Sequence, residues 1–192
     1  MIALFTPLLP GDLLLYRPNN LWGWIIAIKT WAPLSHIETY LGRNLSAAAR
    51  DGIGVGTFPT RGQDLALVLR PFQLFHLPKA LAWHRRMVGQ RYDWMGLLIF
   101  FLAAHAGAPD RMFCSEHTTR LARAGGIEPF NSDFDADRVA PATFLASPAY
   151  YQVWPLKTSS SNKSNPSSHE NSPHYPIRHH DLRMCRAYSW PV

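Results

Sequence analysis

The chain of 192 residues has few cysteines, few acidic residues and no long apolar run, and each shortage excludes a class of protein. Its two cysteines, Cys114 and Cys185, lie far apart in unlike surroundings, which excludes a disulfide framework and a zinc site built on paired cysteines. Two separate, unpaired cysteines are compatible with a reducing compartment. We therefore expect no metal and no cofactor.

The most hydrophobic run, residues 94–106, has about 13 residues, whereas a membrane-spanning helix needs about 20. We expect a buried helix there, with a membrane-facing helix as the minor alternative. The chain start has no basic region and contains Pro7 and Pro10, so it does not resemble a signal peptide. These features predict a cytoplasmic protein for which membrane contact is less favoured.

Acidic residues are outnumbered by basic ones, 13 to 19, and the formal net charge is +6. The basic residues are scattered, with Arg85 and Arg86 as the only adjacent pair, and no nucleic-acid motif accompanies them. The glycines of Asp51–Phe58 are not followed by the Gly-Lys-Ser/Thr of a phosphate loop. We expect no nucleic-acid partner, and charge alone leaves an anionic surface open.

The composition predicts one domain over residues 1–156, because 47% of the chain is hydrophobic and the Ser- and Asn-rich stretch that follows cannot form a core. Residues 157–192 are expected to be a disordered tail. Four tail histidines could touch a metal, but a solvated segment is the favoured interpretation; they are His169, His174, His179 and His180.

Short apolar segments bounded by Gly, Asp or Pro predict strands at Gly11–Arg17, Ser35–Gly42, Asp51–Phe58, Leu65–Arg70 and Tyr150–Trp154. Helices are expected at Pro78–Gln90, after Cys114 and at Ala142–Ala146, and a helix or ordered loop at Leu21–Trp31. Inward positions are predicted for Leu81, Met87 and Val88. Packing in the core or under a flap is favoured over substrate walls for Trp22, Trp24 and Trp31.

Cys114 is expected at the start of a helix, because Leu121 and Ala122 follow at helical spacing and two glycines then stop the pattern. The unpaired N–H groups and the dipole at a helix start favour the thiolate form of a cysteine. Glu116 in the first turn is expected to stabilise the helix end. His117 could reach the thiol, although packing or solvent contact is favoured for it. His76, His84 and His105 show no partner pattern.

The segment Ser35–Gly42 alternates as a half-buried strand does, with His36, Glu38 and Tyr40 on one face. Strand geometry places alternate Cβ atoms about 7 Å apart, so the imidazole and the carboxylate can share one site.

Four segments in order carry a resemblance to a known family: Gly11-Asp12, the Ser35-His36 strand, Gly89–Asp93, and Phe113–Glu116 at a helix start. Over residues 10–154 the chain resembles the permuted papain-like amidases of the YaeF/YiiX group, relatives of NlpC-type cysteine peptidases. The resemblance implies an α+β, papain-like fold in which an antiparallel sheet or barrel packs on helices. Histidine precedes cysteine, as the permutation requires.

The resemblance implies a cysteine amidase with Cys114 as nucleophile and His36 as base, acting without a cofactor on a peptide or other small amide such as a peptidoglycan fragment. It also implies a carboxylate on the strand after the histidine strand, where this chain has Ala47–Ala49. Glu38 is therefore our first choice for the third catalytic residue, and Asp51 is the second.

Two other functions stay open. Lecithin:retinol acyltransferase-like enzymes also place histidine before cysteine, and their action on lipid esters would suit the tryptophan-rich segment and the apolar run. A non-catalytic binding module with the same groove would suit the alanine run. The oligomeric state is not predicted.

Overall fold

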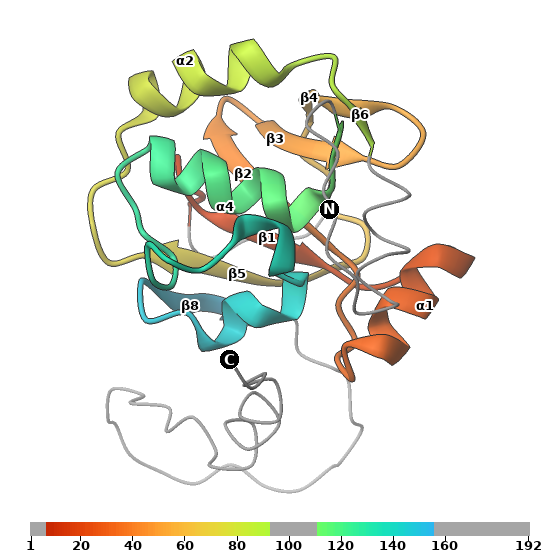
Figure 1. The fold of residues 1–192 in the computed structure, drawn as a ribbon. Coiled ribbons are helices and arrows are strands. Elements are labelled where there is room, and N and C mark those ends of the chain that lie inside the picture. Colours follow the sequence, from red (N-terminus) through yellow and green to blue (C-terminus); the bar gives the residue numbers. More distant parts are fainter. Residues whose placement is uncertain (1–6, 93–110, 156–192) are drawn as a thin grey trace, which may run out of the picture. The chain divides into compact units, whose positions relative to one another are not determined.

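The computed structural model describes residues 7–92 and 111–155, which belong to the first of two units, Met1–Leu156 and Lys157–Val192. The centre of the first unit is a six-stranded antiparallel sheet with the order β4-β3-β2-β1-β5-β8 (Figure 1). Its strands are β1 (Leu13–Tyr16), β2 (His36–Gly42), β3 (Leu45–Arg50), β4 (Gly54–Pro59), β5 (Leu65–Pro71) and β8 (Tyr150–Pro155).

Within residues 7–92 and 111–155, three α-helices and two short 3-10 helices accompany the sheet, and a short parallel pair of strands lies beside β4. The helices are α1 (Leu21–Lys29), α2 (Leu77–Met87), α4 (Cys114–Ala124), η1 (Ala136–Arg138) and η2 (Pro141–Ala146). The parallel pair is β6 (Arg91–Tyr92) and β7 (Arg111–Met112). These elements confirm the predicted α+β class.

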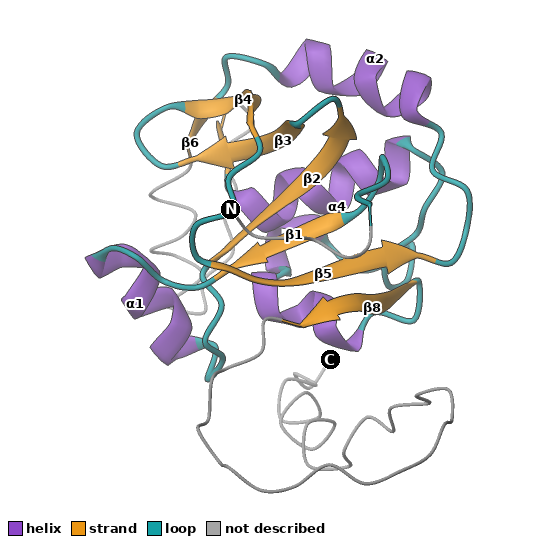
Figure 2. Ribbon diagram, turned by 180° about the vertical axis from the view of Figure 1, so that it is seen from behind, coloured by secondary structure: helices purple, strands orange, loops and turns teal. Residues whose placement is uncertain are grey.

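Helix α4 packs on one face of the sheet, against β2 and β3, and α2 packs beside α4 (Figures 1 and 2). Because successive strand residues point to opposite faces, Leu13 and Leu15 join the main core with α4, whereas Leu14 and Tyr16 join a smaller cluster on the other face. The main core contains Cys114 itself. The first residue of α4 is thus held by the core of the domain.

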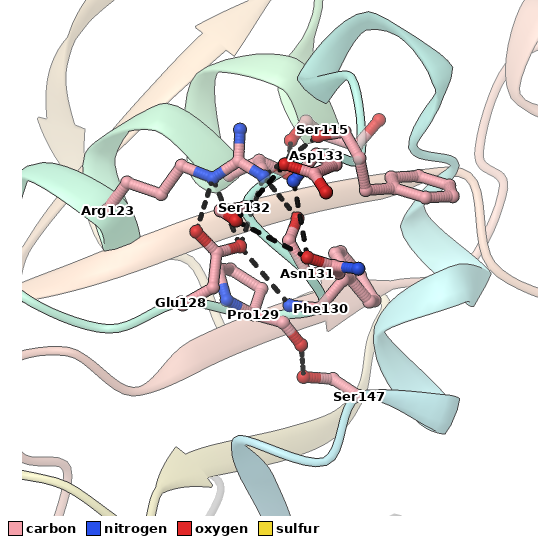
Figure 3. Close-up of polar contacts among 11 residues, drawn as sticks. Ser115, Arg123, Glu128, Pro129, Phe130, Asn131, Ser132, Asp133 and Ser147 are labelled. Atoms are coloured by element: carbon pink, nitrogen blue, oxygen red, sulfur yellow. Dashed lines mark hydrogen bonds and ion pairs between the residues drawn. The ribbon is translucent and has the colours of Figure 1, made fainter.

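A polar cluster fixes the far end of α4 (Figure 3). The guanidinium of Arg123 donates to both carboxylate oxygens of Glu128, at 2.9 and 3.1 Å from Nε, and to the carbonyl oxygens of Asn131 and Phe134. At the other end of the helix, the Ser115 hydroxyl donates to the carbonyl of Val139. The Arg123 contacts restrict how far α4 can slide, and they therefore position Cys114.

The predicted elements agree with the structure except at a few faces and boundaries. The prediction that Val88 faces inward is wrong: α2 ends at Met87 and Val88 is 51% exposed, because the helix buries Ala80 and His84 instead. The packing predicted for Trp24 and Trp31 is also wrong, since both are exposed.

Three predictions fall outside the described residues: the helix at 94–106, the disordered tail and the packing of the Trp22 side chain. In the parts of the chain that the structure describes, no helix is long and apolar enough to cross a membrane.

The Gly11-Asp12 turn before β1 holds a buried ion pair. Asp12 is fully buried and accepts from Arg70 Nε at 2.8 Å, from Arg70 Nη2 at 2.7 Å and from the Leu9 N–H at 2.8 Å. Gly11 has a φ of 96°, and a Cβ there would lie 2.7 Å from Phe75. Only glycine fits this turn, which explains the Gly-Asp motif.

Asp12→Ala should lower the free energy of unfolding by about 3–5 kcal/mol, because it leaves Arg70 and the Leu9 N–H without their buried acceptor. Urea unfolding followed by circular dichroism would measure the loss. Asp135→Ala is the matched control: it breaks an exposed pair with Arg138 and should change stability by less than about 1 kcal/mol. Equal losses in both variants would contradict the prediction.

Candidate active site

His36 and Glu38 face each other at the beginning of β2. The Nε2 atom of His36 lies 3.1 Å from Oε1 of Glu38, which is fully buried, while the His36 side chain is 15% exposed. Strand periodicity puts both residues on one face, and pairing with β1 sets Tyr16 opposite His36. The structure therefore brings the predicted imidazole and carboxylate into direct contact.

Glu38 also binds two arginines that the sequence did not reveal. Arg50 at the end of β3 contacts Oε1 through Nε at 3.0 Å and Nη2 at 2.8 Å, and Arg61 Nε lies 3.7 Å from the same oxygen. Tyr16 Oη lies 3.4 Å from Oε2. Burial would raise the pKa of Glu38, but His36 and the arginines outweigh it and lower that pKa. Glu38 is an anchored carboxylate.

Cys114 is the first residue of α4 and is 3% exposed. Its thiol lies close enough to His36 to raise the pKa of that imidazole. Since Nε2 of His36 is engaged by Glu38, Nδ1 is the ring nitrogen that remains for the thiol. The backbone N–H of Cys114 has no acceptor within the helix, because the first turn of any α-helix lacks one. The structure thus joins Cys114, His36 and Glu38 in one chain of contacts.

The pKa of His36 reflects this position. Burial alone would lower it, but the charge of Cys114 and the hydrogen bonds with Cys114 and Glu38 prevail and raise the pKa from 6.5 to about 9. His36 therefore holds a proton over the neutral range.

The second choice for the third residue, Asp51, is not brought to the site. It lies in the exposed turn after β3, and none of the described contacts joins it to His36. The alanines of β3 are buried: Ala47, Ala48 and Ala49 all have 0% exposure. Close packing explains the small side chains there, and the residue that β3 contributes is Arg50.

A second buried pair, which the sequence pattern did not suggest, adjoins the site. His84 Nδ1 lies 3.1 Å from His117 Nε2, and His84 Nε2 lies 3.0 Å from Thr57 Oγ1. Burial lowers the pKa of His84. For His117, burial is the main cause, and the charges of His84 and His36 add to it, so that its pKa falls to about 3. Both rings stay neutral and do not compete with His36 for its proton.

The pair could not be predicted because its members come from α2 and α4, 33 residues apart. Helical spacing placed His117 one turn after Cys114, but only the packing of the two helices gives it a partner. His84 is 1% exposed and has a partner at each ring nitrogen, although the sequence showed no partner pattern for it.

The fold and these contacts define an α+β protein with a cysteine, a histidine and a glutamate in sequential contact. No known family profile matches the chain, and no curated protein matches it. The structure is similar to the crystal structure of YiiX from Escherichia coli O157:H7, described as a metalloprotein of DUF1105, with a TM-score of 0.58 and 14% sequence identity. The similarity covers 77% of this chain and 97% of YiiX. The chain therefore has a YiiX-like fold.

Proposed function

We propose that this protein is a cysteine hydrolase of the permuted papain-like type that cleaves an amide bond. The observation that carries the proposal is the 3.1 Å contact between His36 Nε2 and the buried Glu38 carboxylate, with Cys114 beside His36 at the start of α4. The YiiX-like fold and the order of histidine before cysteine support it. The substrate class is a peptide or small amide, for which a peptidoglycan fragment is the first to test.

In the proposed reaction, His36 already holds the proton that the Cys114 thiol has given up, and the thiolate sulfur attacks the amide carbonyl carbon. The backbone N–H of Cys114 donates to the oxyanion. The His36 imidazolium then protonates the leaving amine as the C–N bond breaks. Water, deprotonated by His36, hydrolyses the thioester, which releases the acid and restores the thiolate and the imidazolium. Glu38 holds the ring in position and favours its protonated form.

YiiX is described as a metalloprotein, so the described residues were tested for metal ligands. Within residues 7–92 and 111–155, no group of three or more His, Cys, Asp and Glu side chains is placed to hold a metal ion. Every step proposed above uses water and the side chains and backbone of this chain.

Alkylation of Cys114 by iodoacetamide tests the ion pair without knowledge of the substrate. In a Cys185→Ala background Cys114 is the only thiol, and we expect its alkylation, measured by mass spectrometry, to proceed at pH 7. The rate of Cys114 alkylation should show a step near pH 9, where His36 loses its proton. The imidazolium is present below that pH and lost above it. His36→Gln should remove this step.

The exposed His76 provides the control, since His76→Gln should leave the alkylation profile unchanged. If Cys114 reacts only above about pH 8.5, as an ordinary thiol does, the hydrolase proposal fails and the non-catalytic binding module is favoured.

A further inference from the structure

Helix α1 presents a stripe of large apolar side chains to solvent. Leu21 is 73% exposed, Trp24 56%, Ile28 68% and Trp31 77%. The spacing of three, four and three residues places all four on one side of the helix and its last turn. These four residues are called the α1 stripe. Beside it, a shallow hollow of about 280 Å³ is lined mainly by apolar atoms of Trp24, Ala27, Ile28, Trp31, Ala32 and Pro33.

The backbone conformation of Trp31 is a further sign that its exposed side chain has a function. The helix ends in a Schellman motif: the Trp31 N–H donates to the Ile28 carbonyl at 3.2 Å, and the Ala32 N–H to the Ala27 carbonyl at 3.1 Å. Trp31 occupies the left-handed position of this motif, with a φ of 50°, where glycine is the usual residue. A bulky, exposed indole is thus retained at a position that disfavours it both by exposure and by backbone conformation.

The charge around the stripe favours one kind of partner. Residues 13–37 contain no Asp or Glu, Arg17 precedes α1, and the chain has a formal net charge of +6. The Asp64 carboxylate lies before the start of α1, where it accepts from Asn19 Nδ2 at 3.0 Å. Tryptophan and aliphatic side chains beside cationic residues suit the interface of an anionic bilayer.

We propose that α1 docks this protein on anionic phospholipid surfaces, with the α1 stripe inserted at the level of the headgroups. The stripe lies at the same end of the sheet as His36, because α1 connects the end of β1 to the start of β2, where Tyr16 is paired with His36 (Figures 1 and 2). Docking would bring the candidate active site to the lipid surface. The proposal does not depend on Cys114 chemistry.

Flotation of the full chain with vesicles tests the docking. We expect binding to equimolar phosphatidylglycerol and phosphatidylcholine vesicles and little binding to pure phosphatidylcholine. Trp31→Gly should reduce binding about tenfold or more, because one large apolar side chain is lost from the interface. The same substitution should keep or raise the melting temperature, since glycine relieves the left-handed conformation. Loss of binding with an intact fold would support the proposal.

Leu74→Ala is the matched control. Leu74 is also 77% exposed, but it follows β5, whose last residues lie at the end of the sheet away from Tyr16 and His36. Its substitution should leave vesicle binding unchanged. Unchanged binding by Trp31→Gly, an equal loss in Leu74→Ala, or equal binding to pure phosphatidylcholine would each overturn the proposal. So would a dimer, seen by light scattering, that Trp31→Gly dissociates.

Discussion

Cys114→Ala is expected to abolish hydrolysis, with a loss of about 10⁴-fold or more, because no other described group can form the thioester. The fold should persist, since replacing a small buried side chain by alanine costs about 1–2 kcal/mol here. Product release from a mixture of muropeptides and short peptides, followed by mass spectrometry, would measure activity. Circular dichroism would confirm that the variant is folded.

Ser115→Ala is the matched control for the nucleophile. It alters the next residue of α4 and removes the hydroxyl that donates to the Val139 carbonyl, but it leaves the thiol in place. We expect a stability loss of about 1 kcal/mol and retained turnover. Full activity in Cys114→Ala would refute the assignment of the nucleophile, and equal inactivation by both variants would point to a displaced helix.

Glu38→Gln should have the second largest effect, a fall in turnover of about 10–100-fold together with a stability loss of about 2–4 kcal/mol. Glutamine can still hydrogen-bond to His36, but it cannot neutralise the imidazolium or the two arginines, Arg50 and Arg61. The pKa of His36 should fall, so that the alkaline step of Cys114 alkylation moves to lower pH.

The sign of the stability effect follows from the lowered pKa of Glu38. Its contribution is present above the unfolded pKa of about 4.5 and is lost as pH falls through the lower pKa of the folded state. Urea unfolding of the wild type should therefore show a loss of stability in acid that Glu38→Gln lacks. An identical acid dependence would contradict this account.

Two variants separate the roles around Glu38. Arg50→Gln removes a competitor for Oε1 and should raise the pKa of His36, which is opposite to the effect of Glu38→Gln. Asp51→Asn removes the alternative carboxylate and should change neither turnover nor the alkylation profile, because Asp51 is exposed and makes none of the described contacts with His36. A large effect of Asp51→Asn would return it to consideration as the third residue.

Periodicity explains why much of the fold was predictable. A repeat of two identified the strand with His36 and Glu38, and the two glycines after Ala124 marked the end of the cysteine helix. The same reasoning failed for α1 and Val88, because periodicity detects an apolar face without showing what covers it. Trp24 and Trp31 are apolar and well placed for packing, yet the fold leaves both in solvent.

By itself the sequence determined the local elements: Cys114 at a helix start, the shared strand face of His36 and Glu38, and the glycine turn before β1. These follow from backbone geometry over a few residues. Only the tertiary structure decided which groups meet across the chain: Cys114 with His36, Glu38 with Arg50 and Arg61, and His84 with His117. Such contacts depend on sheet register and helix packing, which no short pattern encodes.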